Sequence, residues 1–243
     1  MSEIISVAME LSNKPWGCTI LIDLKPNVTK LPSGMTAIRI KRKTDKQPVW
    51  KTVHEYEVGS FDDLTVTLED RNTIAGEHYT YAAIPVVNSR ETVGSTGEIT
   101  ANFTGWYLAD KTAEYEVGLN VTCSKKKNVS LAFIQTLGSP YPYAVSNGNL
   151  NYYTGNFSAI FLPRKADGEF TKEGSRKFKD EVIEFLSNGF AKILKSEEGE
   201  ALKIRVNESV DLSHSEYPGA AEISFSFTQI GDFPETGLVV VEK

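Results

Sequence analysis

The first hundred residues alternate apolar and polar positions in short runs, which is the period of a β-strand. One face of the run 16–24 carries Trp16, Cys18, Ile20, Ile22 and Leu24. Similar runs follow at 36–43, 49–58, 63–70 and 78–87, with turn residues between them. In the first of these, Ile38 and Ile40 share one face. Short alternating strands at roughly ten-residue spacing are typical of a β-sandwich, so the pattern predicts this fold for the N-terminal part.

The second half of the chain also reads as strands, with one helix. One continuous strand is predicted by the alternation of Tyr115, Val117, Leu119, Val121 and Cys123. Asn147-Gly148 between apolar runs is a hairpin-turn signal. Near the end, Ile223, Phe225 and Phe227 share one strand face. We therefore expect a mainly β protein throughout.

The helix is predicted over residues 175–187, with Ser175 as its N-cap. Its apolar face consists of Phe178, Val182, Phe185 and Leu186. Asn188-Gly189 ends it, because glycine accepts the left-handed conformation past a helix end. A short amphipathic helix is marginal alone, so we expect it to pack on a sheet.

Charge and composition narrow the class of protein. The net charge of −6 and the pI near 5.3 argue against a nucleic-acid partner. No apolar run is long enough to span a membrane, and no secretory signal is visible. Cys18 and Cys123 do not form a disulfide framework, which fits synthesis in a reducing cytoplasm. We expect the run Lys125-Lys126-Lys127 to be a solvated turn.

No catalytic, cofactor-binding or metal-binding residue is assigned. His54, His78 and His214 have no metal-ligand spacing, and no P-loop, dinucleotide or nucleophile-elbow motif occurs. The adjacent carboxylates are expected to be solvated residues beside turns, namely Asp62-Asp63, Glu69-Asp70 and Glu197-Glu198. The sequence therefore predicts a protein that is not an enzyme and has no cofactor. A cell-wall hydrolase remains a distant rival.

Residues 73–81 (TIAGEHYTY) resemble the tyrosine-corner segment of fibronectin type III domains. Tyr79 matches the corner tyrosine, whose hydroxyl bonds back to the backbone of the preceding turn. Trp16 stands where that family keeps a core tryptophan. The resemblance implies a fibronectin type III-like β-sandwich over residues 1–102. The Ser/Thr/Gly-rich stretch that follows the last strand places the boundary near Asn102.

The remaining residues, 103–243, resemble bacteriophage tail and baseplate components. The resemblance rests on Tyr152-Tyr153-Thr154-Gly155, Phe161-Leu162-Pro163, the helix with Asn188-Gly189, and the segment 223–232. It implies a β-rich sandwich or split barrel with one packed helix, related to distal tail and tail-tube proteins. Such proteins assemble as rings, commonly hexamers, with other tail proteins. The implied place is the tail of a virion, after synthesis in the host cytoplasm.

Four tyrosines are candidate contact residues: Tyr141, Tyr143, Tyr152 and Tyr153. Interleaved with asparagine, they fit a subunit interface or the core of a hairpin. They also fit stacking on sugar rings, so the alternative function is a module that binds host-surface carbohydrate. The sequence thus leaves two partners for this segment, another tail subunit or a glycan.

Overall fold

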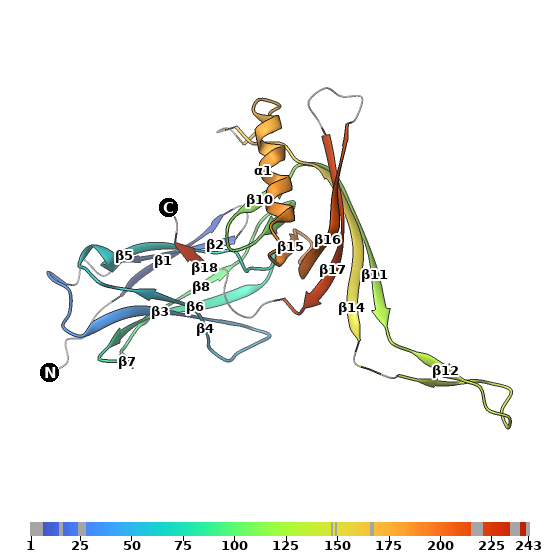
Figure 1. The fold of residues 1–243 in the computed structure, drawn as a ribbon. Helices are drawn as coiled ribbons and strands as arrows, with labels where there is room; N and C mark the ends of the chain where they lie inside the picture. The colour runs from blue at the N-terminus through green and yellow to red at the C-terminus, as the bar shows by residue number, and fades with distance from the viewer. Residues whose placement is uncertain are drawn as a thin grey trace. The chain divides into compact units, whose positions relative to one another are not determined.

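The computed structural model describes residues 7–14, 17–23, 28–146, 148, 150–165, 168–214, 221–233 and 239–241 (Figure 1). Strands make up 57% of the described residues and helical residues 8%, with a single α-helix among them. The predicted mainly β class is confirmed. Within the described residues, no helix has the length and apolar character needed to cross a membrane.

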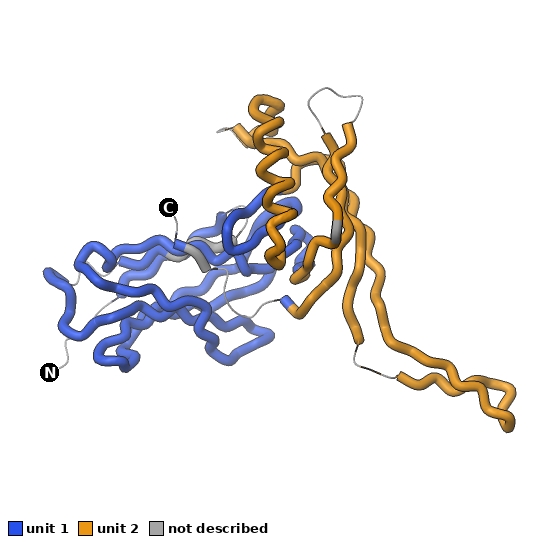
Figure 2. The backbone as a smooth tube through the Cα atoms, viewed as in Figure 1, with its two compact units in different colours: residues 1–116, 193–201, 233–243 blue, residues 117–192, 202–232 orange. Residues whose placement is uncertain are grey.

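The chain forms two compact units, which Figure 2 colours separately. Unit 1 comprises residues 1–116, 193–201 and 233–243, and unit 2 comprises residues 117–192 and 202–232. Unit 1 therefore takes in residues 103–116 and two short later segments, whereas the sequence analysis places one boundary near Asn102. Each unit is described separately below.

Unit 1 contains two antiparallel sheets. The first has the order β1 (Ala8–Lys14), β2 (Gly17–Asp23), β5 (Thr65–Asp70) and β18 (Val239–Val241). The second has the order β4 (Lys51–Glu57), β3 (Met35–Thr44), β6 (His78–Val87) and β7 (Arg90–Glu91), with β8 (Ser95–Thr100) also on β6. A 3-10 turn, η2 (Asp62–Leu64), precedes β5, and β9 (Trp106–Ala109), β10 (Glu114–Val117) and β15 (Lys192–Ser196) complete the unit.

The core of unit 1 combines apolar side chains from both sheets. Ile22 and Leu68 from the first sheet and Ile38, Ile40 and Tyr81 from the second have no exposed surface. Burying such a side chain stabilises the fold by about 1.5–3 kcal/mol. The predicted inward faces are confirmed at Ile22, Ile38 and Ile40. Trp16 and Leu24, and the side chains of Cys18 and Ile20, lie outside the described residues.

The tyrosine-corner hydrogen bond is present. The Ile74 amide donates to the Tyr79 hydroxyl at 2.9 Å, across the turn that contains Gly76. Gly76 has a φ of +78°, which glycine adopts without strain. Burial raises the pKa of the Tyr79 hydroxyl, so the group stays protonated and in place. The local geometry is therefore the one that the resemblance of residues 73–81 implied.

Unit 2 contains a set of four antiparallel strands that pair side by side, called here its sheet. Its order is β16 (Ala201–His214), β17 (Ala221–Gly231), β14 (Asn151–Ile160) and β11 (Leu119–Val129). A separate two-stranded ladder joins β12 (Ala132–Ile134) to β13 (Tyr143–Val145). The helix α1 spans Ser175–Ser187, as predicted.

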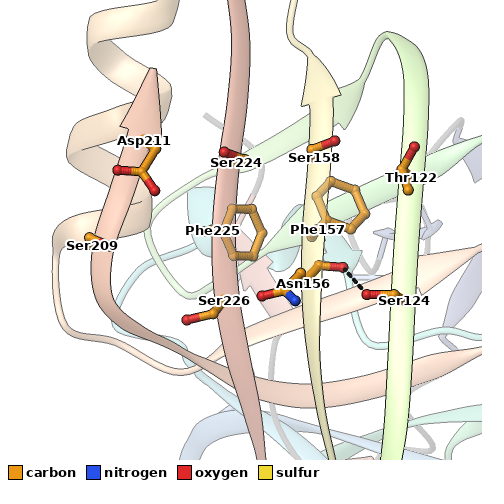
Figure 3. Close-up of a pocket in the computed structure, with 10 residues that line it drawn as sticks. All are labelled: Thr122, Ser124, Asn156, Phe157, Ser158, Ser209, Asp211, Ser224, Phe225 and Ser226. Atoms are coloured by element: carbon orange, nitrogen blue, oxygen red, sulfur yellow. Dashed lines mark hydrogen bonds between the residues drawn. The ribbon is translucent and has the colours of Figure 1, made fainter. Parts of the chain in front are cut away.

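The sheet of unit 2 has one apolar and one polar face. Ile223, Phe225 and Phe227 are buried, as their alternation predicts. Val182, Phe185 and Leu186 of α1 are buried too. The helix lies to one side of the strands in Figure 1 and passes behind β16 in the close-up of Figure 3. We infer that the two apolar surfaces face each other and that the polar face is left open.

Both ends of the helix have a glycine in the left-handed region. The N-cap is Gly174, with a φ of +71°, and not Ser175, which is the first helical residue and is buried. Glycine adopts this positive φ without strain, and no side-chain hydrogen bond caps this end of the helix. At the other end Asn188 is the C-cap and Gly189 has a φ of +75°, as predicted.

Three other predictions fail. The strand expected over 115–123 is divided at Gly118 into β10 and β11, and the register of β11 against β14 is irregular between Leu119 and Thr122. Lys125-Lys126-Lys127 belong to β11 and are not a turn; β14 supplies their cross-strand partners. Glu69 and Asp70 are buried and not solvated, because Arg71 pairs with Glu69 at 3.4 Å and Arg42 pairs with Asp70 at 2.6 Å.

Candidate assembly interface

The residues that continue β11 and precede β14 form a long arm, defined here as residues 129–150. Figure 1 shows the arm, with β12, extending beyond the end of the four-stranded sheet of unit 2. No Asp, Glu, Lys, Arg or His occurs from residue 128 to residue 163, although 24% of the chain is charged. The arm is therefore an uncharged extension of a charged protein.

The arm also exposes large apolar side chains. Half of the large apolar side chains that are exposed among the described residues lie in it. They are Val129, Leu131, Phe133, Ile134, Leu137, Tyr141, Tyr143 and Leu150, each at least 50% exposed. Monomeric proteins rarely expose contiguous apolar patches of this kind, and those that occur are commonly interaction sites.

The tip of the arm, defined here as residues 132–145, is apolar on both faces of its ladder. Its ladder pairs Ala132 with Val145, Phe133 with Ala144, and Ile134 with Tyr143. Neighbouring strand residues point to opposite faces, so Phe133 and Ile134 lie on different sides of the ribbon. Phe133 is 69% exposed and Ile134 is 50% exposed. The ribbon thus lacks the polar face that a strand pair on a protein surface normally presents to water.

A joint separates the tip from the sheet. The β11–β14 ladder ends at the pair Val129 and Asn151, and the tip ladder begins at Ala132 and Val145. Two residues separate the ladders on the side of β11 and β12, and five separate them on the side of β13 and β14. The register of one ladder therefore does not continue into the other. The Ser146 hydroxyl donates to the Ser130 carbonyl oxygen at 3.3 Å across the joint.

The hairpin turn predicted at Asn147-Gly148 is wrong. Gly148 lies in the joint, and Asn147 lies outside the described residues. The strands on either side, β13 and β14, pair with β12 and β11 and not with each other. The chain reverses instead between β12 and β13, in a segment that contains Gly138 and Pro140 and can turn without a regular two-residue hairpin.

The four candidate tyrosines do not form one group. Tyr141 and Tyr143 are in the tip and are 76% and 62% exposed. Tyr152 and Tyr153 are in β14, half-buried and on opposite faces. The Tyr153 amide donates to the Gln229 side chain at 3.0 Å, and its ring lies 5.8 Å from the Lys127 ammonium. Only the first two are available for a contact.

The open face of the sheet in unit 2 is polar and hollowed into a shallow groove, shown in Figure 3. Side chains around it include Thr122, Ser124, Asn156, Ser158, Ser224, Ser226 and Asp211. The Ser124 hydroxyl donates to the Asn156 carbonyl oxygen at 3.5 Å. Phe157 and Phe225 also line the groove, but they are 1% and 3% exposed, so they offer a sugar ring almost no surface.

Unit 1 holds a second set of buried charges. Arg71 Nε lies 3.4 Å from Glu114 Oε2, and Lys195 donates to the Arg71 carbonyl oxygen at 2.8 Å. Burial raises the pKa of the Glu114 carboxyl to about 8, although Lys195 and Arg71 oppose the shift. Among the described residues no group of three His, Cys, Asp or Glu side chains could hold a metal ion.

The predicted histidines are dispersed. His54 is partly buried, and this burial lowers its pKa. His78 Nδ1 lies 3.3 Å from Asp45 Oδ1 at the surface, and His214 is exposed at the end of β16. The three therefore share no site.

Neither a protein-family model nor a curated protein sequence matches this chain. Among solved structures, one similar chain comes from a structure described as the virion of a native gene transfer agent particle. The likeness covers 56% of this chain and 94% of that chain, with 14% sequence identity and a TM-score of 0.31. A likeness at that level carries no property from one protein to the other.

Sequence reasoning missed the arm as a unit. The signal for it is the absence of charge from residue 128 to residue 163, which is visible without any structure. The structure adds that the apolar side chains in this stretch are exposed and not part of a core.

Proposed function

We propose that this chain is a structural subunit of a phage tail or a related tail-like particle, and that it assembles with copies of itself. The observation that carries the proposal is the uncharged, exposed arm of unit 2. The resemblance of residues 103–243 to tail and baseplate components supports it independently. In this proposal the chain belongs to the virion, is made in the host cytoplasm, and contacts other tail proteins.

The arm needs a partner for a physical reason. Removing apolar surface from water contributes roughly 25 cal/mol per Å², and a strand ribbon with open edges is prone to pair with other chains. Natural proteins guard such edges with charge, and Lys125, Lys126 and Lys127 do so along β11. These protecting charges end at Lys127, just before the first residue of the arm. We interpret this change as the boundary between a protected edge and a surface that is covered after assembly.

A ring fits these features better than a two-fold dimer. A ring requires two different surfaces on each subunit, each complementary to the other. The arm offers two distinct apolar faces. We therefore propose a ring, as in distal tail or tail-tube subunits; the number of subunits in it is for imaging to determine.

Light scattering after size-exclusion chromatography, with negative-stain imaging, tests the proposal. We expect the wild-type protein to form defined oligomers or tubes as its concentration rises. A variant in which a short Gly/Ser linker replaces residues 131–145 should remain monomeric. The matched control is Val49→Ser with Val93→Ser, which removes exposed apolar groups from unit 1. A wild-type protein that stays monomeric at every concentration, alone and with other tail proteins, would overturn the proposal.

A second candidate function is recognition of a host-surface glycan, favoured by one observation. Tyr141 and Tyr143 are exposed and two residues apart, a spacing that places both rings on one side of an extended chain. A glycan array tests it, with Tyr141→Ala/Tyr143→Ala as the variant and Tyr152→Ala as the control. Binding that the double variant loses and the control keeps would favour this function.

A further inference from the structure

The tip of the arm raises the question of what covers its second face. A single flat partner covers one side of a ribbon and leaves the other in water. Phe133 and Ile134 are both at least half exposed and lie on opposite sides. Two partner surfaces are therefore needed, one on each face.

We propose that these two surfaces are the arms of two other copies of this chain, so that the tips stack in a closed series. The Phe133 and Ala144 face of one tip would lie on the Ile134 and Tyr143 face of the next. The inference rests on the proposed self-assembly and adds which surfaces meet. The contact is heterologous, because two different faces meet in it, and heterologous contacts close into rings.

Chemical complementarity favours another arm over the rest of unit 2. The other large exposed apolar side chains described in unit 2 are Leu119, Phe190, Leu212 and Ile230. Leu119, Leu212 and Ile230 belong to three different strands, and Phe190 lies between α1 and β15. Charged side chains occur along the body of the unit. The arm carries eight of the exposed large apolar side chains among the described residues, in a stretch of sequence without charge. An uncharged apolar face therefore finds its best match in a second arm.

The size of each face indicates that one contact alone is weak. A large side chain buries at most ~150–250 Å², so one stacked contact buries roughly 600 Å² in total over both copies. Stable interfaces bury about 1,200–2,000 Å². Each contact is therefore below that range, and a tip makes two such contacts only inside a closed series. A closed series of tips is thus stable where an isolated pair is not, and assembly should be cooperative.

Disulfide trapping tests which faces meet, because it detects weak contacts. Ala144 and Val145 are neighbours in β13 on opposite faces of the tip. In full-length protein, a mixture of Ala144→Cys and Val145→Cys should give cross-linked dimers on mild oxidation, and either variant alone should not. The wild type, which keeps its native cysteines, is the control. Cross-linking of one variant with itself would mean a two-fold contact and would overturn the stack.

Charge substitutions test whether both faces are covered. Phe133→Asp and Ile134→Asp place the same charge on opposite faces of one strand. Each should raise the concentration needed for assembly by ~100-fold or more, because a buried unpaired carboxylate is costly. Val93→Asp, at an exposed apolar position of unit 1 outside the arm, is the matched control and should change it little. Circular dichroism confirms that each variant is folded.

The outcomes separate this inference from the proposed function. Tip stacking would be refuted, and self-assembly would stand, in either of two cases. In the first, the wild type assembles but the mixture of Ala144→Cys and Val145→Cys gives no cross-links. In the second, Phe133→Asp or Ile134→Asp assembles as readily as the wild type. A wild type that never assembles would refute both. Binding of the wild type to phosphatidylcholine/phosphatidylglycerol vesicles that Phe133→Asp abolishes would show that lipid covers the tip, and would also overturn the stack.

Discussion

The buried Asp70 gives a sharp test of how unit 1 is held together. Asp70 Oδ2 accepts hydrogen bonds from Arg42 Nη1 at 2.6 Å and from the Tyr81 hydroxyl at 2.7 Å. Its Oδ1 accepts from the Asn72 amide at 2.9 Å. Asp70→Asn keeps the shape of the side chain. It replaces one acceptor with a donor and removes the carboxylate that Arg42 contacts in a buried site.

Breaking a buried ion pair costs about 3–5 kcal/mol, since the remaining charge stays out of water. For a protein of this size each kcal/mol lowers Tm by roughly 2–4 °C. We therefore expect Asp70→Asn to lower the Tm of unit 1 by about 6–20 °C. Thermal and urea unfolding followed by circular dichroism measure the change.

Two further variants make the reasoning refutable. Glu55→Gln breaks the exposed pair with Arg39 and should leave Tm almost unchanged, because water screens that pair. Arg42→Met combined with Asp70→Asn should recover part of the lost stability, since both buried charges are then gone and the amide oxygen can still accept a hydrogen bond from Tyr81 or Asn72. If Asp70→Asn unfolds like the wild type, or if the double variant is as unstable as the single one, the ion pair does not have this role.

Three other predictions concern single positions. Gly155→Val should cost at least about 1–3 kcal/mol in urea unfolding, because its Cβ would lie 2.7 Å from the Phe227 ring and 2.1 Å from a backbone oxygen. Tyr79→Phe should cost about 1–3 kcal/mol in the same assay, because the Ile74 amide loses its acceptor. The pKa of Glu114 is about 8 in the folded protein and 4.5 when unfolded, so the free energy of unfolding should fall as the pH rises from 4.5 to about 8. Glu114→Gln should flatten that fall in Tm measured against pH.

Each of these predictions has an outcome that would contradict it. Gly138→Val, where a Cβ has open space, is the control for Gly155 and should not change stability. Equal effects of the two would rule out the steric explanation. An unchanged stability of Tyr79→Phe would mean that water replaces the hydroxyl. A pH profile of Glu114→Gln that matches the wild type would place the titration on another group.

Alternation along single strands predicted much of the fold. Ile38, Ile40, Ile223, Phe225 and Phe227 point inward because a strand with one buried face tolerates no slip of register. The helix was predictable because its apolar spacing and Asn188-Gly189 are local signals. In these cases the information lies within a few residues of the chain.

The failures involve contacts between distant residues. The pattern over 115–123 is interrupted at Gly118, where the Ile160 carbonyl oxygen of another strand leaves no room for a side chain. The burial of Asp70 depends on Arg42, which lies 28 positions earlier in the chain. The reversal after β12 was missed because Asn147-Gly148 is the stronger local turn signal. The exposure of the arm could not be predicted, because an apolar run reads the same in a core and on a surface.

The joint between the two ladders has a consequence for geometry. Strand pairs twist continuously, and a continuous ladder would pass the twist of the sheet on to the tip. Here two residues oppose five, so the ladder is interrupted and the tip can take its own angle. We expect the body of unit 2 to set how many subunits surround the axis. The same arm could then serve rings of different circumference without a change in its sequence.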